Sequence, residues 1–288
     1  FFKLTRSISD SMAVTLLSAE PFYRQVLSKN SPQNIKTSHE YWSARDKYIA
    51  RFRQLIGPAE IVLVVRRQED FAESMYQEQI KVTKYSKDFR TYLEKFWFHF
   101  NYADQADAWA SHFPSVKIIP FYKIQGEHIT KNFLSLAGIR AKNIQDGKLQ
   151  NVGLPQDGVI LKRAANSLRL PQDTYKAFSE CILSDRFRNA LPSDKRSFFS
   201  SAAERSDFYQ QHVPENVRLA SRAGLTIDQL FGPAKADNFV YGDSVTKDSL
   251  EIMLRILQSV LSDGHLEQLR KAVKGSPRPR EHRAVKNG

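Results

Sequence analysis

The sequence predicts an α/β fold in which a central parallel sheet is flanked by helices and followed by a mostly helical C-terminal part. Two short, mainly apolar runs, residues 61–65 and 116–119, have the length and composition of strands in a sheet that is covered on both faces. Segments with helical periodicity separate these runs, and such alternation favours parallel pairing with right-handed crossover connections. From residue 154 onward the apolar spacing is helical.

One strand and one helix are expected before the first of these runs. Residues 13–17 are apolar and β-prone, which predicts a short strand. Thr37 and Glu40 have the spacing of a capping box, in which each side chain bonds to the backbone N–H of the other residue. Apolar residues then recur at helical spacing as far as Gly57-Pro58, a pair that ends helices.

In the middle of the chain, predicted strands alternate with predicted helices. The predicted ranges are a strand at 60–66, a helix at about 69–82, a long aromatic-rich helical stretch at 89–112, a strand at 116–121 and a helix at 129–136 that ends near Gly138. Because strands and helices follow one another in this order, the two strands are expected to lie parallel in one sheet.

The rest of the chain is expected to be helical. Helices are predicted at 159–168, 174–183 and 215–223, then a loop at 232–242 and an amphipathic helix over residues 250–261. We therefore divide the chain into an α/β core at 1–150, a helical region packed on it at 151–267, and a basic tail at 268–288. The tail holds seven Lys or Arg and one acid, without apolar periodicity, so we expect it to be disordered.

Composition narrows the classes of protein that fit. The chain has 288 residues and a net charge of +12, which favours anionic ligands such as nucleotides or nucleic acid. It has no run of 18 or more apolar residues, so no membrane span is expected. Its single cysteine, Cys181, suits a reducing compartment, and we expect a cytoplasmic protein. With one Cys and seven scattered His, no metal site is expected.

The most informative segment joins the strand at 60–66 to the helix that follows it. Arg66 ends the apolar run, and Ser74 lies eight residues later. A guanidinium donates two parallel hydrogen bonds to phosphate oxygens, a serine hydroxyl donates a third, and ligands of open α/β sheets bind at the carboxyl ends of strands. This pattern predicts a phosphate site. The alternative is an ordinary strand and surface helix, with Arg66 or Arg67 paired to Asp70 or Glu73.

The same segment resembles the nucleotide 3′-phosphate site of sulfotransferases that use 3′-phosphoadenosine 5′-phosphosulfate (PAPS). In that family a strand ends in Arg, Ser follows eight residues later and Tyr two after that, and this chain has Arg66, Ser74 and Tyr76. Asp70 and Ala72 also match, and Gln68 departs from the Pro that many members carry. The Arg-Arg-Gln sequence here looks more like bacterial saccharide sulfotransferases than like animal cytosolic ones.

The resemblance implies a fold, a reaction and a cofactor. It implies a P-loop-like central sheet, and transfer of a sulfuryl group from PAPS to a hydroxyl of a saccharide or glycolipid, with adenosine 3′,5′-bisphosphate (PAP) as product and no metal. The likeness extends over roughly residues 10–170, through weaker matches such as Ser18-Ala19-Glu20 and Phe121-Tyr122-Lys123. The family's loop for the 5′-phosphosulfate is not found in the sequence, and we expect it upstream of Phe1.

A sulfotransferase also needs a base for the acceptor hydroxyl. Glu20 is the first candidate, because it follows a predicted strand, and His39 at a predicted helix start is the second. Either could instead be an ordinary surface residue. His99 lies among aromatic residues and is expected in the core.

Two other functions fit parts of the sequence. One is a non-enzymatic protein that binds nucleic acid or an anionic surface through its basic tail, although no recognised nucleic-acid-binding motif accompanies that tail. The other is a different nucleotide-dependent transferase, such as a kinase or a glycosyltransferase.

Overall fold

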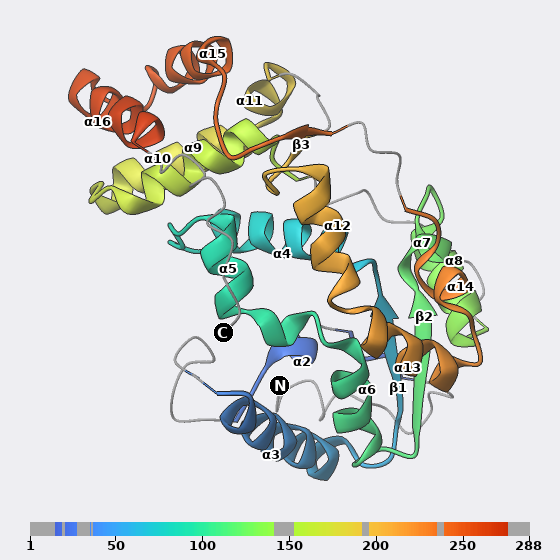
Figure 1. Ribbon diagram of the computed structural model, residues 1–288. Coiled ribbons are helices and arrows are strands. Elements are labelled where there is room, and N and C mark those ends of the chain that lie inside the picture. The colour runs from blue at the N-terminus through green and yellow to red at the C-terminus, as the bar shows by residue number, and fades with distance from the viewer. Residues whose placement is uncertain are drawn as a thin grey trace, which may run out of the picture. The chain divides into compact units, whose positions relative to one another are not determined.

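The computed structural model describes residues 15–18, 21–27, 35, 37–140, 153–191, 196–234 and 239–275. Over these residues the chain is a mixture of many helices and two small parallel sheets, each of two strands (Figure 1). The predicted α/β class therefore holds in this coarse sense.

The chain divides into two compact units that interleave along the sequence. Unit 1 comprises Phe1–Arg67, Lys95–Asp146 and His212–Pro233, and unit 2 comprises Gln68–Glu94, Gly147–Gln211 and Ala234–Gly288. Neither unit is a continuous stretch of chain, so each depends on contacts between residues far apart in sequence.

Unit 1 contains the larger of the two strand pairs. Strands β1 (Glu60–Val65) and β2 (Ser115–Pro120) pair in parallel, in a register that runs from Glu60 opposite Ser115 to Val65 opposite Pro120. Both strands and their parallel pairing were predicted correctly. The other elements of unit 1 are α2 (Pro21–Arg24), α3 (Ser38–Ile56), the 3₁₀ helix η2 (Trp97–His99), α6 (Tyr102–Ala110), α7 (Phe121–Ile124), α8 (Ile129–Ala137), α13 (Val213–Ala223) and α14 (Ile227–Phe231).

Helix α3 begins and ends where the sequence predicts. The Thr37 hydroxyl accepts from the Glu40 N–H at 3.2 Å, and the Glu40 carboxylate accepts from the Thr37 N–H at 3.3 Å, which completes the capping box. At the other end Gly57 has φ of 76°, a conformation that glycine adopts without steric cost, and the helix stops. The prediction of a strand at 13–17 is not confirmed: residues 15–18 are not in a strand, and residues 13 and 14 lie outside the described residues.

The long helix expected at 89–112 is instead broken into three. The pieces are α5 (Phe89–Lys95), η2 and α6. Phe96, Phe98, His99 and Phe100 are all buried, and their rings pack against one another where the chain leaves α5. The Asn101 side chain then accepts from the Asp104 N–H and starts α6 as a new helix.

Unit 2 is mainly helical and is built around α9. Its elements are α4 (Gln68–Val82), most of α5, α9 (Gln156–Ser167), α10 (Gln172–Leu183), α11 (Asp185–Asn189), β3 (Arg196–Ser197), α12 (Ala202–Gln210), β4 (Val240–Tyr241), α15 (Lys247–Leu257) and α16 (Asp263–Lys274). All ten residues from Gln156 to Ala165 are buried, so α9 contacts its neighbours on every side. Helices α10, α15 and α16 pack around it (Figure 1).

Helices were predicted close to α4, α8, α9, α10, α13 and α15, but two predictions for the C-terminal region need correction. The predicted disordered tail begins at 268, whereas residues 268–274 are the last turns of α16. Leu266, Leu269 and Val273 are buried on one face of that helix, and this spacing was overlooked beside the basic charge. Residues 276–288 lie outside the described residues. Strand β4 lies within the expected loop at 232–242.

A fully buried arginine ties the elements of unit 1 together. Arg45 of α3 donates from Nε to the side-chain oxygen of Gln105 at 3.0 Å, and from its two terminal nitrogens to the backbone oxygens of Gln25 at 2.6 Å and Phe22 at 2.7 Å. The guanidinium carbon also lies 5.1 Å from the ring centroid of Trp109. One side chain thus joins α2, α3 and α6, because the planar guanidinium directs its donors toward three separate acceptors.

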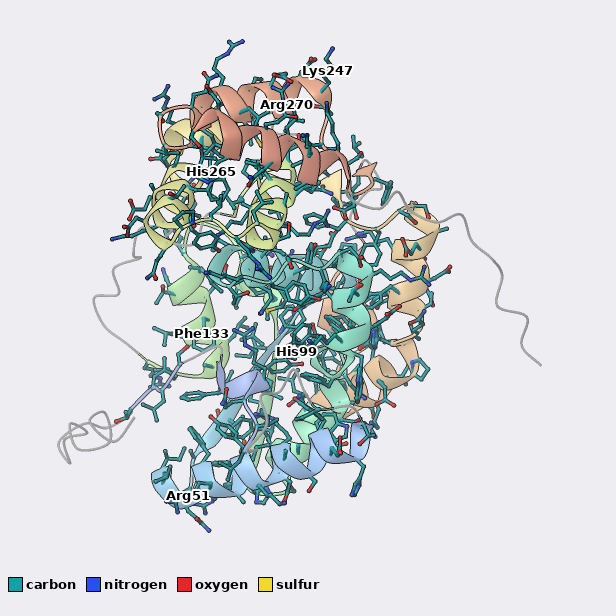
Figure 2. All side chains as sticks on the ribbon, turned by 90° about the vertical axis from the view of Figure 1, so that its left-hand side faces the viewer. Arg51, His99, Phe133, Lys247, His265 and Arg270 are labelled. Atoms are coloured by element: carbon teal, nitrogen blue, oxygen red, sulfur yellow. The ribbon has the colours of Figure 1, made fainter. Side chains whose placement is uncertain are left out.

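We expect Arg45→Met to destabilise the protein by about 2–4 kcal/mol, because one buried and two partly buried acceptors lose their donor. Chemical denaturation gives the change in free energy of unfolding. The control is Arg51→Met on the same helix, where the side chain is exposed and points outward (Figure 2), so a change within about 0.5 kcal/mol is expected. Equal effects of the two substitutions would contradict the role assigned to Arg45.

Candidate functional site

The carboxyl edge of the β1–β2 pair carries the arginine that the sequence singled out. Because the strands are parallel and Val65 lies opposite Pro120, the residues that follow them, Arg66 and Phe121, leave the sheet at the same edge. The guanidinium carbon of Arg66 lies 5.3 Å from the centroid of the Phe121 ring, within the range of a cation–π interaction. Arg66 is partly buried, which restricts the orientations of its side chain.

The neighbouring residues make this edge cationic. Arg67 follows Arg66, and the Lys123 ammonium lies 5.9 Å from the ring centroid of Tyr122 in α7. The Tyr122 hydroxyl donates to the backbone oxygen of Gln229 at 2.9 Å. An edge with several cations close together favours an anion, since each positive charge adds to the local potential.

Gly232 brings the chain after α14 close to the same tyrosine. A Cβ atom at this position would lie only 3.0 Å from the Tyr122 ring, and Gly232 has φ of 71°. Both observations require glycine here. Together with the bond from Tyr122 to Gln229, this contact seats α14 beside α7 at the sheet edge.

Ser74 lies on the exposed side of α4, in unit 2. The helix buries nine of its residues, whereas Ser74 is exposed, so its hydroxyl is open to a ligand. Arg66 belongs to unit 1, and the convergence of these two side chains on one phosphate stays a prediction. In unit 2, the Asp70 carboxylate accepts from Arg205, and the Glu73 carboxylate accepts from Ser197 and Phe198.

Of the two candidate bases, one lies outside the described residues and the other is exposed. Glu20 lies outside the described residues, and residues 15–18 before it are not in the expected strand. His39 is exposed in the first turn of α3, and its imidazole makes no hydrogen bond within the described part of the chain. The role of each as a base therefore stays a prediction.

His99 lies in the core of unit 1, as expected (Figure 2). Its ring stacks on Phe96 at a centroid distance of 5.5 Å and meets Phe98 edge-on at 4.5 Å. Its Nδ1 is buried and has no hydrogen-bond partner among the described residues. Burial, together with the charges of Arg24 and Arg45, lowers the pKa of His99 from 6.5 to about 3. The imidazole is therefore neutral at neutral pH and out of reach of a substrate.

Sequence reasoning missed a buried lysine in unit 2. The Lys162 ammonium donates to the Tyr175 hydroxyl at 2.5 Å and to the Ser179 hydroxyl at 3.1 Å, and it lies 4.0 Å from the Tyr175 ring centroid. Burial, reinforced by the charge of Lys84, lowers the pKa of Lys162 to about 8. Lys162-Arg163 interrupts an apolar run of α9, and two cations inside such a run were the signal that could have revealed this cluster.

Comparison with protein-family models, with curated protein sequences and with solved structures gives no match for this chain. Within the described residues no group of three or more His, Cys, Asp or Glu side chains is placed to hold a metal ion. None of the helices in the described ranges has both the length and the hydropathy needed to cross a membrane.

The environment of His99 predicts how stability depends on pH. Its pKa is about 3 when folded and 6.5 when exposed, so between these values the unfolded chain binds a proton that the folded chain does not. Stability contributed by the neutral ring is therefore complete above about pH 6.5 and is lost progressively as the pH falls toward 3. We expect His99→Phe, which keeps an aromatic ring and removes the titration, to reduce this loss.

Urea denaturation at pH 7 and pH 4 measures the loss for each variant. His39→Gln, which replaces an exposed histidine, is the control and should lose as much stability as the wild type. If His99→Phe also loses as much as the wild type, the buried imidazole is not a source of acid lability.

Proposed function

We propose that this protein is a PAPS-dependent sulfotransferase that transfers a sulfuryl group to a hydroxyl of a saccharide or glycolipid. The observation that carries the proposal is the position of Arg66, directly after a parallel strand and with its guanidinium carbon over the Phe121 ring at a cationic sheet edge. A guanidinium is planar and its N–H groups lie in that plane, where two of them can donate to two oxygens of a phosphate. The motif from Arg66 to Ser74 supplies the resemblance.

The finer fold is part of the same proposal. Strands β1 and β2 would belong to a P-loop-like central sheet, with α4 following β1 as the helix that carries Ser74. The parallel β1–β2 pair and the two-residue connection from β1 to α4 support this assignment. In such folds ligands bind beyond the carboxyl ends of the strands.

Each residue has a defined part in the proposed reaction. Arg66 and Ser74 bind the 3′-phosphate of the donor and fix its position, and they take no part in bond breaking. The acceptor oxygen attacks sulfur, the bond from sulfur to the phosphate oxygen breaks, and PAP leaves. A base, for which Glu20 and His39 are the candidates, takes the proton of the acceptor hydroxyl. Cations at the sheet edge stabilise the negative charge of the phosphates.

The 3′-phosphate provides the test. We expect the protein to bind PAP more tightly than adenosine 5′-phosphate, which lacks that group, in isothermal titration calorimetry. Arg66→Ala removes charge-assisted hydrogen bonds to the phosphate and should weaken PAP binding by about 10- to 100-fold, with little effect on adenosine 5′-phosphate. Arg67→Ala, which removes the adjacent cation, is the matched control: it should weaken the binding of both nucleotides by a similar factor and so keep most of the preference for PAP.

The rival functions predict different results in binding measurements. A protein that binds nucleic acid or an anionic surface through its tail should lose affinity for that partner when residues 276–288 are deleted. Its affinity for the partner should also fall steeply as the salt concentration rises. A different nucleotide-dependent transferase should bind its nucleotide without regard to the 3′-phosphate. Equal affinity of the wild type for PAP and adenosine 5′-phosphate would overturn the sulfotransferase proposal.

A further inference from the structure

Helix α4 is anchored along one side by three polar contacts. Asp70, Glu73 and Tyr76 recur every three residues, so they form one stripe along the helix, and all three are buried. Each is bonded to a residue that follows it by 87 to 135 positions in the sequence. These partners, like α4 itself, belong to unit 2.

The outer two anchors use arginines. Arg205 of α12 donates to the Asp70 carboxylate at 2.6 Å, and its other terminal nitrogen lies 3.8 Å from the carboxylate of Glu69. Arg163 of α9 donates to the Tyr76 hydroxyl at 3.0 Å and also to Asp243. Removing either arginine would take the cation from a carboxylate that is buried, Asp70, or partly buried, Asp243, so these two arginines stabilise the fold as a whole.

The central anchor is smaller and lies nearest to Ser74. The Glu73 carboxylate oxygen Oε1 accepts from the Ser197 hydroxyl at 2.6 Å and from the Phe198 N–H at 2.8 Å. Ser197 is fully buried, and its backbone belongs to β3, which pairs with β4. Glu73 is thus held by two donors from adjacent residues, which restrict both its position and its direction.

The direction of Glu73 determines the direction of the next residue. Successive side chains of an α-helix are rotated by roughly 100°, so a helix held at Glu73 on its buried side presents Ser74 on another side. Ser74 is exposed, and Phe71 and Glu78 of the same stripe are partly exposed. Rotation of α4 about its axis would move Ser74 away from that orientation and would break the bond from Ser197 to Glu73.

We propose that Ser197, acting through Glu73, is a positioning residue that holds the Ser74 hydroxyl in the orientation needed to bind the 3′-phosphate. This inference rests on the proposed function, because it assigns Ser74 to that phosphate. Ser197 does not touch the donor. It sets the rotation of α4, and so the selectivity for a nucleotide that carries a 3′-phosphate.

The test is a double-mutant cycle on selectivity, measured as the Kd for adenosine 5′-phosphate divided by the Kd for PAP, well below the melting temperature of every variant. We expect Ser197→Ala to lower this ratio several-fold, as Ser74→Ala does. Because both act on one contact, the double variant should be no less selective than Ser74→Ala alone. Ser249→Ala is the matched control: Ser249 is also buried in unit 2, its hydroxyl has no partner among the described residues, and the ratio should not change.

Two substitutions of Glu73 keep the test decisive if Ser197→Ala does not fold. Glu73→Gln keeps an oxygen that accepts from Ser197 and Phe198, so it should retain wild-type selectivity. Glu73→Met fills the same space without an acceptor, so it should lose selectivity as Ser74→Ala does. A purely structural role of the anchor would lower the melting temperature of Glu73→Met and leave the ratio of the two Kd values unchanged.

The two proposals fail in different ways. A wild-type protein without preference for PAP, or a Ser74→Ala variant as selective as the wild type, overturns the assignment of the phosphate site. A wild type that prefers PAP and loses the preference in Ser74→Ala, but keeps it in Ser197→Ala and Glu73→Met, overturns the positioning role alone.

Discussion

Three buried carboxylates on the first turns of α4 constrain the rest of unit 2. Glu69, Asp70 and Glu73 are each at most 8% exposed, and a buried carboxylate is stable only with donors or cations beside it. Arg205 lies near the first two, whereas Glu73 is held by a hydroxyl and a backbone N–H, and burial raises its pKa. The carboxylates of α4 therefore help to determine where β3 and α12 lie, although these elements follow α4 by more than one hundred residues.

The described helices of unit 1 are held together by a buried cation, not by buried carboxylates. There a buried cation, Arg45, is satisfied by neutral acceptors, two of which are backbone oxygens of the segment before α3. Its bonds hold α2 against α3 and α6, and the adjoining aromatic side chains exclude water from the contact. The sheet edge at Arg66 lies in this same unit.

Sequence patterns predicted helix and strand boundaries well where these boundaries depend on residues that are close together in the sequence. The capping box at Thr37, the glycine after Ile56 and the apolar run before Arg66 each act within a few residues, and each was placed correctly. The break at 96–101 was missed because it depends on how several aromatic rings share one core. The aromatic spacing looked helical, and only tertiary packing turns those side chains inward.

For the candidate site, too, features that depend on neighbouring residues were predicted from the sequence, and contacts between distant segments were not. The position of Arg66 at the end of a strand followed from sequence, because strand ends are marked by the loss of apolar character. Its contact with Phe121 depends on the register between β1 and β2, and no local pattern encodes a register between segments some fifty residues apart. The partners of Glu73 and Asp70 could not be predicted either, since bonds that span more than 120 residues leave no periodic trace.

The interleaving of the two units has a consequence for how the protein is made. Unit 1 draws its last segment, with α13 and α14, from residues that follow most of unit 2, and unit 2 is completed only by α15 and α16. Neither unit can therefore finish folding while its final stretch is still inside the ribosome. During synthesis, surfaces of α6 and α9 stay uncovered until their late partners emerge, and in that interval the nascent chain is most exposed to proteases and in most need of chaperones.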